Sequence, residues 1–111
     1  MDRVEAYRKE IKRILREHQT HAPTSWPIEK ILICDEQQDH YLLLELGWDK
    51  SKRLDTIIIY ARLQAGKIWI EVDWTERGVA RELMEAGVPK DDIVLAFHPP
   101  EKRRYTEFAV A

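Results

Sequence analysis

Few residues of this chain have the types and spacing that catalysis requires. Glu71 and Asp73 flank Val72 on a predicted strand, so their carboxylates should lie on the same side. Paired carboxylates can bind a hard cation or divide the acid and base roles of a hydrolase. A nuclease-like site would also need a lysine or a further carboxylate beside them, which this strand does not offer. Solvated surface carboxylates are the simpler interpretation, and a metal-dependent hydrolase is the less favoured alternative.

Histidine and cysteine give little more support to an enzyme. His18 and His21 are three positions apart, which could place two imidazoles on one metal if a helix continued through both. Pro23 follows closely, so a structural role for His18 near a helix end is favoured. Cys34 is the single cysteine and has no adjacent motif that would lower its pKa. We therefore expect a protein that is not an enzyme, with no catalytic residue, metal or cofactor.

The best candidate for contact with nucleic acid is the basic segment Lys102, Arg103 and Arg104, which precedes Tyr105. Cations neutralise phosphates, and a tyrosine ring can stack on a base. Three charges are a small footprint, and the formal net charge of −2 argues against tight autonomous DNA binding. Contact with a protein partner or a solvated turn explains the segment equally well. A dimer that binds DNA through two such segments stays open as an alternative.

Hydrophobic periodicity predicts the elements that position these residues. The 111 residues suit one domain, 1–111, and apolar positions spaced by three and four predict a helix over residues 2–20. Segments rich in β-branched residues predict strands at 28–34, 41–48, 56–63, 67–74 and 93–97. Thr75 is the expected N-cap of a second helix that ends before Gly87.

These elements predict an α+β fold. Short connections make neighbouring strands antiparallel, so we expect a meander of four or five strands, with the long N-terminal helix and the second helix on one face. The longest apolar runs have about five residues, far fewer than the ~20 needed to cross a membrane. With a single cysteine and no apolar N-terminal segment, a reducing cytoplasm is the expected compartment.

The strands are apolar on both sides, although two helices can cover only one face of such a sheet. An uncovered apolar face is typical of an interaction site. We expect a homodimer or another protein partner there, unless the C-terminal tail folds across this face. The interface residues expected from strand alternation are Tyr41, Leu43, Ile58, Tyr60 and Trp69.

The second half of the chain is also distinctive as a string. Residues 67–80 read KIWIEVDWTERGVA, residues 82–100 read ELMEAGVPKDDIVLAFHPP, and the chain ends in RYTEFAVA. With the N-terminal helix and the strand that ends Gly47-Trp48-Asp49, these strings resemble the XisI family, the fdxN element excision controlling factors of cyanobacteria. The resemblance extends over nearly the whole chain.

This resemblance implies an accessory role in the programmed excision of a DNA element during heterocyst differentiation. In that system a separate recombinase exchanges the strands, and a second accessory factor, XisH, accompanies XisI. An XisH-like protein is therefore an expected partner, beside a second copy of the chain. The family offers no catalytic residue to carry over to this sequence.

Overall fold

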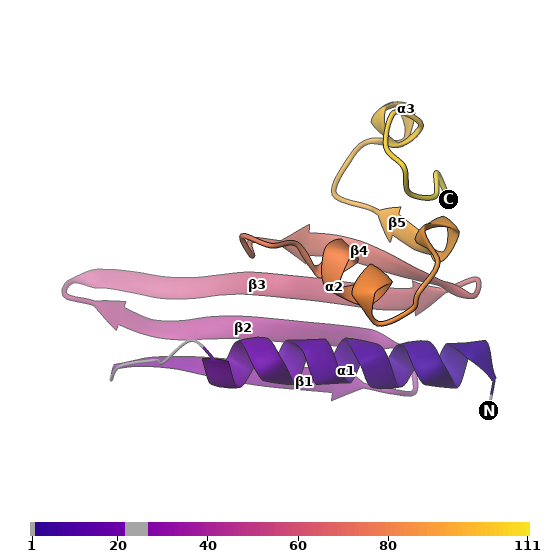
Figure 1. The fold of residues 1–111 in the computed structure, drawn as a ribbon. Helices are drawn as coiled ribbons and strands as arrows, with labels where there is room; N and C mark the ends of the chain where they lie inside the picture. Colours follow the sequence, from indigo (N-terminus) through magenta and orange to yellow (C-terminus); the bar gives the residue numbers. More distant parts are fainter. Residues whose placement is uncertain (1, 22–26) are drawn as a thin grey trace.

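A long N-terminal helix lies against a five-stranded sheet in this computed structural model, which describes residues 2–21 and 27–111 (Figure 1). The helices are α1 (Arg3–His21), α2 (Val79–Glu85), the 3₁₀ helix η1 (Lys90–Asp92) and α3 (Pro100–Arg103). The strands are β1 (Ile28–Asp35), β2 (His40–Asp49), β3 (Lys52–Gln64), β4 (Lys67–Asp73) and β5 (Ile93–Leu95). The predicted α+β class is confirmed.

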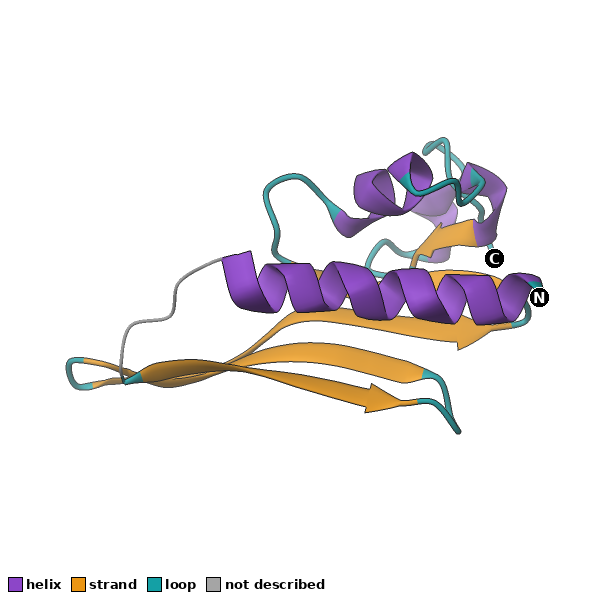
Figure 2. Ribbon diagram, turned by 60° about the horizontal axis from the view of Figure 1, so that its bottom comes forward, coloured by secondary structure: helices purple, strands orange, loops and turns teal. Residues whose placement is uncertain are grey.

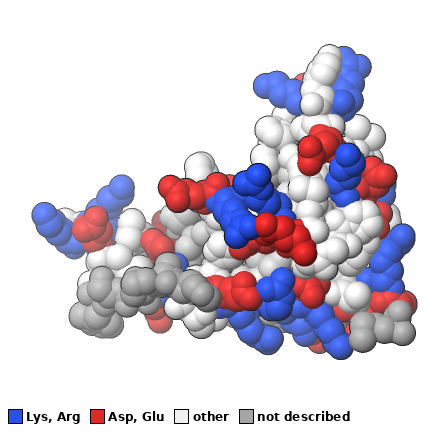
Figure 3. All heavy atoms as spheres, in the orientation of Figure 1, with Lys and Arg blue, Asp and Glu red and all other residues white. Residues whose placement is uncertain are grey.

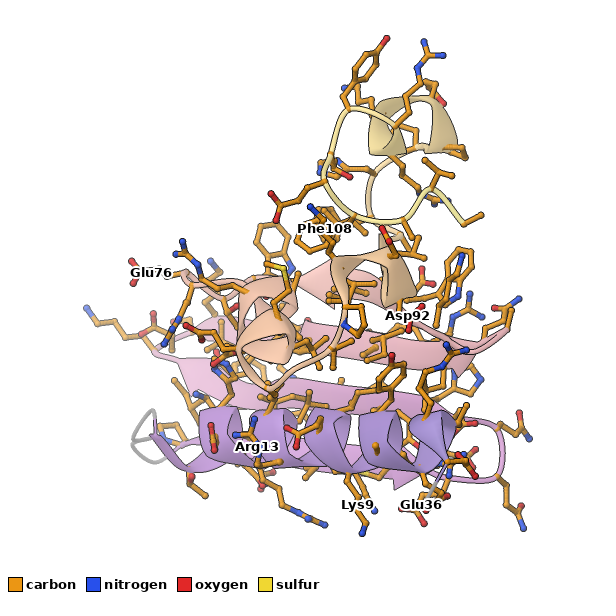
Figure 4. All side chains as sticks on the ribbon, turned by 45° about the vertical axis from the view of Figure 1, so that its right-hand side comes forward. Lys9, Arg13, Glu36, Glu76, Asp92 and Phe108 are labelled. Atoms are coloured by element: carbon orange, nitrogen blue, oxygen red, sulfur yellow. The ribbon has the colours of Figure 1, made fainter. Side chains whose placement is uncertain are left out.

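Helix α1 forms where the apolar stripe predicted it and is fastened at its first turns. Asp2 accepts a hydrogen bond from the Glu5 amide at 2.8 Å, which satisfies a donor that the helix itself leaves unpaired. Farther along, the Tyr7 hydroxyl donates a hydrogen bond to the carboxylate of Asp92 in η1. Figure 4 shows the position of Asp92. Burial and this bond raise the pKa of Tyr7 to about 12. The contact ties the N-terminal helix to the segment that precedes β5.

The sheet has the order β1-β2-β3-β4-β5, and its first four strands form the expected antiparallel meander. The fifth strand is parallel to β4 and has only three residues, whereas the sequence predicted 93–97. A parallel pair needs a long crossover, which α2 and η1 supply between Asp73 and Ile93.

Helix α2 begins at Val79, four residues after the predicted N-cap, Thr75. The N-cap is Gly78, which has no side chain to accept a hydrogen bond. Asp73 takes over this task, because its Oδ1 accepts from the Thr75 amide at 2.9 Å and its Oδ2 accepts from the Val79 amide at 2.7 Å. Gly87, at φ +99°, follows the helix as predicted.

The core lies between α1, α2 and one face of the sheet (Figure 2). Helix α1 contributes the buried residues Tyr7, Ile11, Ile14 and Leu15, and α2 contributes Val79, Ala80 and Leu83. The sheet contributes every second residue of its central strands, namely Tyr41, Leu43, Ile59, Ala61, Leu63, Ile68 and Ile70.

The C-terminal tail lies at the β5 end of the sheet. The Ala109 amide donates to the Ile93 carbonyl oxygen at 2.9 Å, and Phe108 packs against the core (Figure 4). Figure 1 shows α3 and the tail beyond β5, away from β1 and β2. The tail therefore does not fold across the second face of β1–β3, which was the alternative to a partner.

The chain exposes more surface than its mass suggests. Its accessible surface is 7104 Å², about a tenth above the roughly 6,400 Å² expected for a folded monomer of 13.2 kDa. The radius of gyration is 14.6 Å, against about 13 Å for a compact domain of this length. In Figure 2 the helices lie on one side of the sheet, and the other side of β1–β3 faces away from them.

Candidate functional site

The side of the sheet opposite α1 carries an apolar surface that crosses four strands. Strand register places Ile33, Leu42, Tyr60 and Val72 in one cross-strand row. Ile31, Leu44 and Ile57 form a second row. Paired residues in neighbouring strands share a face. We call these two rows the open face; its members are Ile31, Ile33, Leu42, Leu44, Ile57, Tyr60 and Val72.

Solvent reaches the open face directly. Ile33 and Ile57 are 44% and 36% exposed, and the other five members are half-buried by one another. By contrast Leu43, which lies between Leu42 and Leu44 on β2, is fully buried under the helices. Large aliphatic side chains gathered on one exposed sheet face are typical of a surface that binds another protein.

Two β-bulges decide which residues reach this face. Leu43 pairs with Ile59 but Leu44 pairs with Ile57, so Ile58 is an extra residue on β3. The bulge turns Ile57 to the open face, whereas Ile58 packs against the core. The second bulge lies between β3 and β4, where Glu71 is the unpaired residue.

The predicted interface residues therefore divide between the two faces. Tyr41, Leu43 and Ile58 do not belong to the open face: the first two are 0% exposed, and the third packs on the core. Tyr60 lies on the open face as predicted. Trp69 is on that side of the sheet, but the guanidinium of Arg103 from the C-terminal segment lies over its ring. Strand alternation alone assigned Tyr41, Leu43 and Ile58 to the wrong face, because the register between strands and the bulge at Ile58 determine which face each residue reaches.

Tyr41 is held in the core by a polar network at its hydroxyl. The hydroxyl donates to Asp39 Oδ1 at 2.7 Å, and Arg8 Nε donates to the same carboxylate at 2.9 Å. Burial opposes the ionisation of Asp39, yet the hydrogen bonds from Arg8 and Tyr41 outweigh it and hold the pKa of Asp39 below its ordinary value. Burial, assisted by Asp39, raises the pKa of Tyr41. Helix α1 is thus fastened to the β1–β2 turn.

Polar groups at the end of the open face are paired with one another. The Tyr60 hydroxyl and His40 Nδ1 are 2.7 Å apart in a hydrogen bond. Arg62 Nε donates to Glu71 Oε2 at 3.0 Å on the neighbouring strands. The ion pair between Arg62 and Glu71 neutralises its own two charges beside the apolar rows.

Glu71 and Asp73, the two carboxylates considered as a metal site, bond to different parts of the fold. Glu71 forms its ion pair with Arg62, whereas Asp73 bonds the turn that leads into α2. Among the side chains of residues 2–20 and 27–111, no group of three or more His, Cys, Asp or Glu is placed to hold a metal ion.

His18 and Cys34 both take structural positions. His18 Nε2 lies 2.7 Å from Glu82 Oε2 and links α1 to α2. The helix continues to His21, beyond the end expected from Pro23. Cys34 is half-buried against the core, and burial raises the pKa of its thiol despite the opposing charges of nearby cations. A raised thiol pKa disfavours the nucleophilic thiolate.

The basic C-terminal segment is partly used within the molecule. Arg103 donates to three main-chain carbonyl oxygens of its own segment, the nearest at 2.9 Å, and its guanidinium lies 5.8 Å from the centre of the Trp69 ring. This residue fastens α3 to β4. Lys102 and Arg104 are exposed, and Arg104 contacts Tyr105 with an Nη2–OH distance of 2.9 Å. Only two of the three predicted contact residues are thus presented to solvent.

The observed architecture is that of a small α+β protein whose five-stranded sheet is covered by helices on one face and open on the other. The chain belongs to the XisI family: the family described as "XisI protein" matches residues 1–110. This finding confirms the family that the sequence strings suggested.

Two solved structures are similar to the chain over almost its full length. A XisI-like protein from Anabaena variabilis is 34% identical, with a TM-score of 0.93, and the alignment covers 99% of this chain and 100% of that one. The fdxN element excision controlling factor XisI from Anabaena variabilis is 45% identical, with a TM-score of 0.88 and the same coverage. A comparison with curated proteins gave no match. None of the described helices is long and apolar enough to cross a membrane.

Proposed function

We propose that this chain is a controlling factor for the excision of a DNA element, in the manner indicated by the name of its 45%-identical relative. The cell in which it would act is a cyanobacterium undergoing heterocyst differentiation, where a recombinase performs the strand exchange. The chain itself would act in the cytoplasm and would not be an enzyme. The observation that supports an action through contact with protein is the open face.

Contact with protein, not catalysis, is the activity that the described side chains favour. The groups with catalytic potential are engaged in holding the fold: Asp73 bonds the start of α2, Glu71 pairs with Arg62, and His18 contacts Glu82. The open face, in contrast, has large apolar side chains in contact with solvent. Burial of such a face is favourable by about 25 cal/mol per Å² of apolar surface.

A second copy of the chain is the occupant that the open face fits best. With strands about 4.8 Å apart, four strands make the face about 19 Å wide; two rows of same-face residues, at a rise of about 3.3 Å per residue, cover about 13 Å along the strands, or about 250 Å² in projection. That area suits a dimer at the weaker end of specific interfaces, which bury less than about 600 Å² per partner, with micromolar affinity. The apolar rows carry no charge, so burying them against a second copy removes no ionised group from water.

The test is to delete the gene in its native host and to return wild-type or variant copies. Sequencing reads across the junctions of excised elements give the excision frequency. We expect deletion to reduce excision, wild type to restore it, and Leu42→Glu, which places a charge in the open face, to leave it low. Tyr105→Glu is the matched control, because Tyr105 is 77% exposed and follows α3, beyond β5 and away from β1 and β2.

Two results would contradict the proposal in different ways. Unchanged excision after deletion would show that the chain does not control this process. Restored excision with Leu42→Glu would show that the open face is not needed for it. If Leu42→Glu fails to restore excision and the wild-type chain is a monomer, the occupant is another protein, for which an XisH-like factor is the first candidate.

A further inference from the structure

The turn between β2 and β3 projects from the rest of the sheet. Ile28 is the first residue of β1 and pairs with Gly47, so β2 continues beyond β1 from Trp48 onward. The register of β3 with β4 ends at Ile59 and Asp73, so the first half of β3 has no β4 partner. Figures 1 and 2 both show this hairpin as an arm that extends beyond the end of α1. We call residues 48–53 the hairpin tip.

The hairpin tip carries a net positive charge, although the whole chain is acidic. Its cations are Lys50, Lys52 and Arg53, and its single acidic residue is Asp49, which gives a formal charge of +2 against −2 for the whole chain. All residues of the tip are exposed, and Figure 3 shows blue groups of Lys and Arg, with red acidic atoms between them, at this end of the molecule. Among the described residues, Lys50 and Lys52 form no ion pair, so their charges are free to neutralise a ligand.

An aromatic side chain accompanies these cations. Trp48 is 46% exposed and pairs across the hairpin with Arg53, whose guanidinium lies 5.2 Å from the centre of the indole ring. Arg53 also approaches the Gly47 carbonyl oxygen at 3.5 Å. The tip therefore presents a planar apolar surface between positive charges, held in place by the strand pairing at its base.

We propose that the hairpin tip is a binding site for double-stranded DNA. A two-stranded ribbon fits the major groove, which is about 12 Å wide, and cations on such a ribbon reach the phosphates on both sides of the groove. Trp48 offers the apolar surface for a base edge or sugar. An acidic peptide would be attracted by the same charges, but it would not require a ribbon that projects clear of the remaining, acidic molecule. This site is distinct from the open face and does not depend on the proposed dimer.

The affinity for a 20-bp duplex, measured by fluorescence anisotropy at a series of NaCl concentrations, tests this site. Three phosphate contacts predict a slope of log Kd against log salt concentration near 2.7, which is about a 40-fold weaker affinity at 200 mM than at 50 mM. Lys50→Glu/Lys52→Glu should weaken binding at 50 mM by more than about tenfold and reduce the slope to near 1. Trp48→Ala should weaken binding without changing the slope, because the indole is uncharged.

The matched control is Lys102→Glu/Arg104→Glu, which reverses two exposed cations on the C-terminal segment and changes the net charge equally. We expect this variant to bind with an affinity within about twofold of wild type. Equal loss in both double variants would overturn the proposal, because it would attribute binding to overall charge. Displacement of the duplex by polyglutamate at equal charge, or tighter binding of a single strand of the same sequence, would also overturn it.

Discussion

Adjacent leucines on β2 give the sharpest test of which face of the sheet is buried. Leu43 is 0% exposed beneath α1, whereas Leu44 lies on the open face and is half-buried by its neighbours. Truncation of a buried leucine to alanine costs about 2–5 kcal/mol through lost transfer energy and the cavity left behind. We expect Leu43→Ala to lower the free energy of unfolding by about 3 kcal/mol. Leu44→Ala should cost the monomer about 1 kcal/mol, since less of its surface leaves water on folding.

Urea denaturation followed by circular dichroism measures both values, at a protein concentration low enough for the monomer to dominate. For 111 residues, an unfolding entropy of about 2.1 cal/mol/K per residue converts the Leu43→Ala loss to a fall in Tm of about 13 °C. At high protein concentration the free energy of unfolding of Leu44→Ala should fall further below that of wild type, because the variant lacks the stability that dimerisation adds. Equal costs for the two variants at low concentration would refute the assignment of the faces.

Three further substitutions test how the sheet and helices are held. Gly47→Ala should destabilise the chain strongly in urea denaturation, because a Cβ at Gly47 would lie 2.2 Å from the Pro27 carbonyl oxygen; a stability within about 0.5 kcal/mol of wild type would contradict this close approach. The pKa of Asp39 is lower in the folded chain than its ordinary value, so the ionised carboxylate stabilises the fold above that ordinary pKa. This stability is lost as the pH falls below about 4. Asp39→Asn should therefore reduce the acid sensitivity of the free energy of unfolding, and an unchanged pH profile would count against the network. Asp73→Ala should cost about 1–3 kcal/mol, because the Val79 amide loses its acceptor; a thermal melt identical to wild type would show that the bond is dispensable.

The order of the elements could be predicted from the sequence, because hydrophobic periodicity and turn residues act locally. The 3.6-residue stripe located α1, and β-branched runs located the first four strands. Parallel pairing of β5 could not be predicted, since it depends on how the α2 crossover returns to the sheet. Thr75 was expected to be the N-cap itself; its hydroxyl instead accepts from the amide of the N-cap residue Gly78, and Asp73 accepts from the Val79 amide.

The existence of a second apolar face could also be predicted, but its residues could not. Alternation assigns two sides to each strand without saying which side of one strand matches which side of the next. The register places Leu42 and Tyr60 in one row, and the bulge at Ile58 turns Ile57 outward. Neither the register nor a bulge has a local signal in this sequence. Arg103 was likewise expected at a contact surface, whereas its partners are the carbonyl oxygens and indole that the tertiary fold brings to it.

The mass of the chain in solution tests the open face most directly. Sedimentation equilibrium at about 100 µM should give a wild-type mass approaching twice the 13.2 kDa of the chain, with dissociation at low micromolar concentration. Leu42→Glu should sediment as a monomer with an unchanged circular dichroism spectrum, and Tyr105→Glu should remain a dimer. A wild-type mass of 13.2 kDa at every concentration, or a dimer that survives Leu42→Glu, would contradict self-association through this face.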